Sequence, residues 1–154
     1  MSTELAKATQ QALAGNLEEL LGAVQELAAP LSEEQFWRKP IDPGNSFGHL
    51  VLHLTGNLRH FAGARLGKSG YVRDREREFT ETRVPAKATA LAGLVEAVAE
   101  FRRVVEGVSA EGLVERHPDG EKLGTVVNGL LRLVAHFALH RGQMSYIARL
   151  VQQR

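Results

Sequence analysis

The sequence predicts an all-α fold, a four-helix bundle that forms a single domain over residues 1–154. Four long segments repeat apolar side chains at the spacing of an α-helix, and none alternates apolar and polar side chains as a strand does. The connection between the second and third helices is roughly 18 residues long, far more than a helical hairpin requires. Because a loop of that length can return along a whole helix, we expect an up-down-down-up topology with this long crossover.

The bulk composition is that of a globular protein that needs no cross-link. A chain of 154 residues with 44% hydrophobic and 24% charged residues can bury a core of its own. Its 19 basic and 18 acidic residues are interspersed, which argues against the basic face that nucleic-acid binding requires. The lack of cysteine excludes disulfides and a protein thiolate as nucleophile or metal ligand. Since the sequence carries no signal peptide and no membrane span, we expect a cytoplasmic protein without a membrane partner.

The first helix is expected from about Thr3 to Ala28. Its apolar side chains recur on one side, with carboxylates between them, at Leu13, Leu17, Leu20, Leu21, Val24 and Leu27. Pro30 ends this helix, because proline disfavours the helical conformation in the residue before it. Residues 32–35, Ser-Glu-Glu-Gln, match a capping box, which predicts one short helical turn carrying Phe36 and Trp37.

The other three helices are delimited by similar signals. Asn45 or Ser46 caps the second helix, which extends to about Leu66. We expect the third helix from about Ala86 to Val108 and the fourth from about Thr125 to Gln152. The third helix carries only apolar and surface-type side chains, so we expect it to be structural.

A polar interruption of the fourth helix is the clearest sign of function. Steps of three and four residues along this helix give a stripe that is apolar at both ends and polar at three successive positions, His136, His140 and Gln143. Burying imidazole and amide groups without partners costs free energy, so these side chains need a ligand or polar contacts. Two histidines one helical turn apart can bind one metal ion on a single helix face.

The second helix offers further imidazoles on one stripe, at His49, His53 and His60. Three histidines from the two helices would form a facial set that suits zinc, nickel or iron(II) and leaves coordination positions open for water or substrate. The alternative is that each histidine is a hydrogen-bonded core or boundary residue. His117 lies apart in a Pro-Asp-Gly turn, and we expect it to be solvated.

Two known kinds of histidine site do not fit this pattern. Phe137 stands where a zinc protease of the His-Glu-x-x-His type has its general base. Leu133 and Phe137 stand three residues before the two histidines of the fourth helix, where di-iron bundles carry glutamates. The sequence therefore predicts a mononuclear site.

Three segments carry a family resemblance: residues 50–59 (Leu-Val-Leu-His-Leu-Thr-Gly-Asn-Leu-Arg), the charged run 73–79 (Arg-Asp-Arg-Glu-Arg-Glu-Phe) and residues 136–143 (His-Phe-Ala-Leu-His-Arg-Gly-Gln). They are similar to the signatures of the DinB-like superfamily, a set of metal-binding four-helix bundles, and the resemblance covers nearly the whole chain. It implies one metal ligand from the second helix and two from the fourth. In this sequence they are His53, His136 and His140.

The polar neighbours of this set have alternative roles. His49 could be a fourth ligand or only a neighbour, and His60 has no counterpart in the family pattern. Gln143 could hydrogen-bond a metal-bound water or make an interhelical contact, and Asn57 could orient an imidazole or cap a backbone group. We expect the charged run 73–78 to be a solvated loop, although an ordered ladder of its charges could line the site or brace a dimer.

The resemblance implies one of two functions. Relatives include thiol-dependent S-transferases and a mycothiol-dependent isomerase, which predicts an enzyme that activates a low-molecular-weight thiol, or water, at a divalent metal ion. Since the chain has no cysteine, the thiol has to come from a cosubstrate. The alternative is a non-catalytic, metal-binding stress-response bundle in which the ion fastens the second helix to the fourth. The resemblance also implies a homodimer and an unidentified small-molecule substrate.

Overall fold

A computed structural model describes residues 2–153, and all regular elements in this range are helices. Four long elements make up the bundle: α1 (Thr3–Ala28), α3 (Phe47–Leu58) with its π-helical continuation η1 (Arg59–Ala64), α5 (Lys87–Gly107) and α8 (Val126–Gln152). Short helices lie in the connections: α2 (Glu33–Trp37), α4 (Arg77–Thr80), α6 (Ala110–Val114) and α7 (Gly120–Leu123). No helix within residues 2–153 is long and apolar enough to span a membrane.

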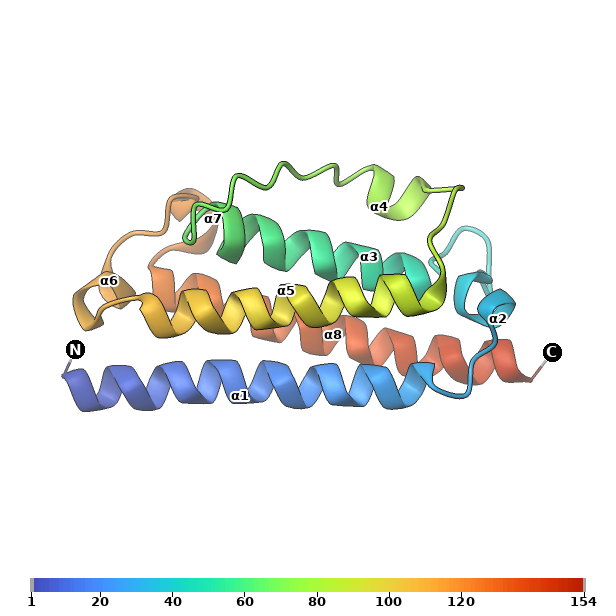
Figure 1. Cartoon of the computed structure of the whole chain (residues 1–154), viewed down its shortest axis with the longest axis horizontal. Coiled ribbons are helices and arrows are strands. Elements are labelled where there is room, and N and C mark those ends of the chain that lie inside the picture. Colours follow the sequence, from blue (N-terminus) through green and yellow to red (C-terminus); the bar gives the residue numbers. More distant parts are fainter. Residues whose placement is uncertain (1, 154) are drawn as a thin grey trace.

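The bundle has the expected up-down-down-up topology. Figure 1 shows α1 and α8 running in one direction and α3 and α5 in the opposite direction. Helix α1 contacts α5 and α8, and α3 contacts the same two helices. The chain between η1 and α5 returns along the outer side of α3, where α4 contacts that helix (Figure 1). The fold class and the long crossover that the sequence predicted are thus confirmed.

Hydroxyl caps determine where the helices begin. Ser46 caps α3, since its Oγ accepts a hydrogen bond from the backbone amide of His49 at 3.0 Å. Ser32 and Gln35 form the predicted capping box, with Ser32 Oγ 3.1 Å from Gln35 N and Gln35 Oε1 3.0 Å from Ser32 N. Each such cap satisfies an amide that the first helical turn leaves unpaired and contributes about 1 kcal/mol.

The second bundle helix departs from the regular helix that the sequence predicts up to Leu66. From Arg59 to Ala64 the chain is π-helical, as in the 3.0 Å hydrogen bond from Arg65 N to His60 O. A π-turn spans five residues between donor and acceptor instead of four, so side chains within it are rotated relative to those of the preceding α-helix. His60 is the second residue of this segment; it lies outside the three-histidine group that includes His53.

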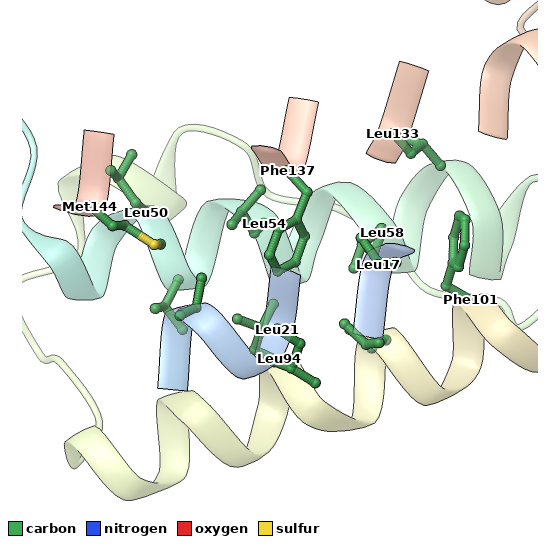
Figure 2. Packing of buried hydrophobic residues seen from close by; sticks show 14 of the residues in the cluster. Leu17, Leu21, Leu50, Leu54, Leu58, Leu94, Phe101, Leu133, Phe137 and Met144 are labelled. Atoms are coloured by element: carbon green, nitrogen blue, oxygen red, sulfur yellow. The ribbon is translucent and has the colours of Figure 1, made fainter. Parts of the chain in front are cut away.

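The core lies between the four long helices (Figure 2). It is built from buried leucine, phenylalanine and methionine side chains that all four helices supply, among them Leu17, Leu21, Leu50, Leu54, Leu58, Leu94, Phe101, Leu133, Phe137 and Met144. Full burial of one such side chain contributes about 1.5–3 kcal/mol.

Phe137 occupies the core position of α8 that lies next to the histidine pair. Its side chain is 0% exposed and faces the other helices (Figure 2). His136 and His140 lie to one side of Phe137 and are only half-buried. The polar stripe therefore adjoins the core of the bundle instead of interrupting it, which corrects its predicted placement among the core side chains.

Gln10 of α1 links two parts of the bundle in the interior. The residue is buried, and its Nε2 donates hydrogen bonds to the backbone oxygens of Val105 and Val108, each at 2.8 Å. These carbonyls lie at the end of α5, where the helix itself supplies few donors. Gln10 of α1 thus supplies hydrogen-bond donors to backbone carbonyls at the C-terminal end of α5.

We expect Gln10→Ala to lower the free energy of unfolding by about 1–3 kcal/mol, because the Val108 carbonyl then loses its side-chain donor and the Val105 carbonyl keeps only the 3.4 Å bond from the Val108 amide. Urea unfolding followed by circular dichroism measures this change. The adjacent Gln11 is exposed, so Gln11→Ala is the matched control and should unfold like the unmodified protein. Equal stability of the two variants would contradict this role of Gln10.

Candidate metal centre

Three histidine side chains from α3 and α8 meet at one point between the two helices. His53 of α3 is buried, and His136 and His140 of α8 are half-buried. Nε2 of His136 lies 3.2 Å from Nε2 of His53 and 3.0 Å from Nε2 of His140. One ring nitrogen from each histidine lies within 4.8 Å of the other two, a spacing at which the three can share one ion. The structure thus brings together the three residues that the sequence suggested as a ligand set.

The partners of the outer ring nitrogens determine which nitrogens can bind a cation. His53 Nδ1 lies 2.9 Å from Glu78 Oε2, and His140 Nδ1 lies 2.7 Å from Gln143 Oε1. Both oxygens accept hydrogen bonds, so we assign the proton of each ring to Nδ1 and a lone pair to each Nε2. A single proton on Nε2 of His136 can serve only one of these two lone pairs. The donor set therefore fits a cation that all three nitrogens share.

The outer nitrogen of His136 differs from those of His53 and His140, because no described residue offers it such a partner. Its Nδ1 is buried and has no hydrogen-bond partner within residues 2–153. Among the described residues, the polar contacts of this ring are those of its Nε2 with the other two imidazoles. A metal ligand of this kind would be held by packing instead of by an outer hydrogen bond.

A buried carboxylate holds His53 in its orientation. Glu78 of α4 is 6% exposed and accepts two further hydrogen bonds from Arg73, from Nε to Oε1 at 2.7 Å and from Nη2 to Oε2 at 2.8 Å. This bidentate pair compensates the buried charge and leaves Oε2 facing Nδ1 of His53. Carboxylates in this position fix the ring orientation of metal-binding histidines and raise their basicity.

Gly56 allows the carboxylate to approach α3. A Cβ atom built on Gly56 would collide with Oε1 and Cδ of Glu78. The glycine lies three residues after His53, so it provides the free space directly beside the ring that Glu78 holds. On another side of this ring, the ring of Phe79 lies with its centroid 4.7 Å from that of His53.

Burial keeps His136 and His140 uncharged at neutral pH by lowering the pKa of both imidazoles. Burial, followed by the neighbouring His140 and His53, lowers the pKa of His136 to about 4. Burial also lowers the pKa of His140. For Glu78, burial alone would raise the pKa, but hydrogen bonds from His53 and Arg73 outweigh this effect and lower it. Neutral imidazoles beside an ionised carboxylate are the protonation states that metal binding requires.

His49 does not join the cluster. Its Nδ1 lies 2.6 Å from Ser46 Oγ, and its Nε2 lies 3.1 Å from the backbone oxygen of Glu81. Both ring nitrogens thus have partners at the start of α3 and in the crossover. In this geometry His49 is a buried neighbour and not a fourth ligand.

His117 is buried, and the expectation that it is solvated is wrong. Its backbone amide donates to Gly124 O at 2.9 Å, which folds the Pro-Asp-Gly turn back and places the ring against Gly129 of α8. The residue is 2% exposed, and its Nδ1 accepts a hydrogen bond from the amide of Asp119 at 3.0 Å. His60 lines a surface depression beside His117 and lies outside the three-histidine cluster.

The two polar residues that the sequence placed near the ligands lie beside the cluster. Gln143 contacts His140 of its own helix, an arrangement that the sequence did not predict. Asn57 is buried on α3, and its side chain makes no hydrogen bond within residues 2–153.

Sequence reasoning missed Arg73 and Glu78. The run 73–78 is expected mainly as a solvated loop, and this is wrong for these two side chains, which are 9% and 7% exposed. The available signal was Gly56, because a glycine inside a helix costs about 1 kcal/mol relative to alanine and indicates a close approach. It does not indicate which residue approaches.

Comparisons with known proteins show what this chain is similar to in sequence and in fold. A family model described as mycothiol-S-transferase matches residues 12–152. The solved structure of YfiT from Bacillus subtilis, described as "a probable metal-dependent hydrolase with an unusual four-helix bundle topology", is similar to this chain with a TM-score of 0.71. The two chains are 18% identical, and the match covers 97% of this chain and 89% of the YfiT chain, which shows a shared fold. No curated protein matches the chain.

We expect His117 to make folding sensitive to acid. Burial lowers its pKa below the usual 6.5, so the unfolded chain binds a proton at a pH where the folded chain does not. Stability should therefore fall as the pH drops below about 6.5. His60, His136 and His140 have lowered pKa values too, so the test compares slopes. His117→Asn should take up fewer protons on unfolding than the unmodified protein, by up to about one per molecule. Its unfolding free energy should therefore fall less between about pH 7 and about pH 5. Identical slopes of unfolding free energy against pH would contradict the prediction.

Proposed function

Because the chain belongs to the mycothiol-S-transferase family, which is DinB-like, we propose that it is a metal-dependent enzyme that transfers a low-molecular-weight thiol to a small electrophile. The convergence of three Nε2 atoms, of which those of His53 and His140 present lone pairs, is the observation that carries this proposal. The chain has no cysteine, so the thiol is a cosubstrate.

His53, His136 and His140 would hold one divalent ion through Nε2. Zinc or nickel suits three imidazoles best, and iron(II) is also compatible with them. When bound, such an ion lowers the pKa of a thiol or of water and supplies a nucleophile at neutral pH. Since both nitrogens of His49 are engaged elsewhere, the protein offers three ligands and leaves room for a substrate atom.

The surrounding residues hold the ligands ready. Glu78 accepts a hydrogen bond from His53 Nδ1 and thereby keeps Nε2 turned toward α8. Gln143 acts in the same way on His140, and Arg73 keeps Glu78 ionised inside the fold. No rearrangement of these side chains is needed before an ion binds, which lowers the free-energy cost of forming the site.

A non-catalytic bundle, in which an ion only fastens α3 to α8, is the competing interpretation. Structural zinc sites complete a closed set of four protein ligands, whereas catalytic sites keep a position open. A set of three histidines with a cavity beside His136 supports the catalytic interpretation. Within that interpretation, water in place of the thiol would give a hydrolase, the activity in the description of YfiT.

Untagged protein reconstituted with zinc or nickel is expected to hold about one equivalent of metal by elemental analysis. His53→Ala and His136→Ala should abolish tight binding, because two imidazoles make a poor chelate. His60→Ala, which changes a histidine outside the cluster, is the matched control and should keep the metal. Less than about a tenth of an equivalent in the unmodified protein would refute the site.

The activity is tested on the same preparations, with mycothiol or N-acetylcysteine as the thiol and monochlorobimane as the electrophile. The metal-loaded protein should accelerate thiol transfer, and the metal-free protein should not. Equal activity in the two forms would contradict the proposed chemistry. Full metal content without transfer or hydrolysis would favour the non-catalytic bundle.

Gly56→Ala is expected to weaken zinc affinity about 10–100-fold, because the added Cβ moves Glu78 away from His53. Competition with a fluorescent zinc chelator measures this affinity. Gly22→Ala is the control, since it adds the same methyl group to α1 where no atom lies within 4 Å. Glu78→Gln should reproduce the loss, and unchanged affinity in both site variants would show that the carboxylate does not support the ligand.

A further inference from the structure

An open surface depression, called the cavity below, begins at His136 and lies between α3, α7 and α8. Apolar side chains form its walls: Phe61, Leu123, Leu133 and Leu139. Its volume of about 410 Å³ falls within the range of about 300–1,000 Å³ that is usual for small-molecule sites. Because His136 is part of its lining, a molecule bound in the cavity would lie next to the three-histidine cluster.

Two polar side chains interrupt the apolar lining, and neither has an acidic partner. Asn57 is 8% exposed, yet its amide makes no hydrogen bond to any residue between 2 and 153. Because no group of the described residues occupies this amide, it is free to bond to a molecule in the cavity. Arg132 donates one hydrogen bond, from Nη1 to Lys122 O at 2.6 Å. No carboxylate of the described residues forms an ion pair with Arg132, and none lines the cavity.

The helix directions place these two side chains at the same end of the cavity. Asn57 lies four residues after His53 on α3, and Arg132 lies four residues before His136 on α8. Since α3 and α8 are antiparallel neighbours, both displacements lead in the same direction along the bundle (Figure 1). Four residues of helix span about 6 Å. Hydrogen-bond donors thus lie about one helical turn from the cluster, with apolar walls in between.

We propose that this cavity binds the electrophilic substrate, and that this substrate has an apolar body and a carboxylate about 6 Å from the atom that reacts at the cluster. The guanidinium of Arg132 and the amide of Asn57 bind the carboxylate, and the apolar walls contact one side of the molecule. This inference rests on the proposed function for the reaction, but the cavity itself can be tested without metal.

Phenylbutyrate and its neutral amide, phenylbutyramide, are the probes, because they differ only in the group that Arg132 and Asn57 would bind. Ligand-observed NMR titrations measure the affinity of each for metal-free and for zinc-loaded protein. The carboxylate should bind about tenfold more tightly than the amide, the difference that one charge-assisted hydrogen bond provides. Equal affinities, or no binding of either probe, would overturn the proposal.

Two pairs of variants locate the probe. Ala135 is exposed on α8 and lines the cavity, so Ala135→Phe should fill it and abolish binding, whereas Ala138→Phe, on the same helix outside the cavity, should not. Arg132→Gln should remove the preference for the carboxylate, and Arg141→Gln should leave it. Binding that survives Ala135→Phe, or a preference that survives Arg132→Gln, would overturn the assignment.

Zinc content separates the two proposals. Zinc binding without binding of the probes would contradict the proposed role of the cavity and would still support the metal centre. Binding of the probes by a protein that takes up no zinc would contradict the metal centre and would still support the proposed role of the cavity.

Discussion

The ion pair between Arg73 and Glu78 is the interaction on which the site depends. An unpaired carboxylate buried to this degree would lose ionisation or unfold its surroundings, but Arg73 bonds to both of its oxygens. The compensated carboxylate then fixes the proton of His53 on Nδ1 and leaves Nε2 free to face α8. The ion pair within the crossover loop therefore determines which ring nitrogen of His53 faces the other two histidines, between α3 and α8.

The topology explains why a loop can take this role. Helices α3 and α5 run in the same direction, so the chain between them has to return along the whole bundle (Figure 1). That return path brings α4 against the outer side of α3, at Gly56, where no side chain separates the carboxylate from the helix. The crossover that the parallel pair requires is thus also the segment that orients His53.

Much of this arrangement follows from local sequence signals. Helical periodicity and caps at Ser32 and Ser46 predict the bundle, and the loop length predicts its topology. The pair His136 and His140 follows from a polar break in an apolar stripe. The burial of Glu78 does not follow from such signals, because it depends on a contact with His53, 25 residues away in sequence. The π-helix is likewise not marked by any of these signals. A charged run is usually solvated, and only the fold shows which of its side chains meets a histidine.

The packing between α3 and α8 bears on what an ion would do there. Leu54 and Phe137 are buried in the core between the helices (Figure 2), and Phe137 directly follows His136 on α8. Apolar side chains thus join these helices directly, whereas in small zinc domains the metal supplies much of the folding free energy. An ion held by the three histidines would lie beside the cavity. A coordination position open toward that cavity is the arrangement that a reaction requires.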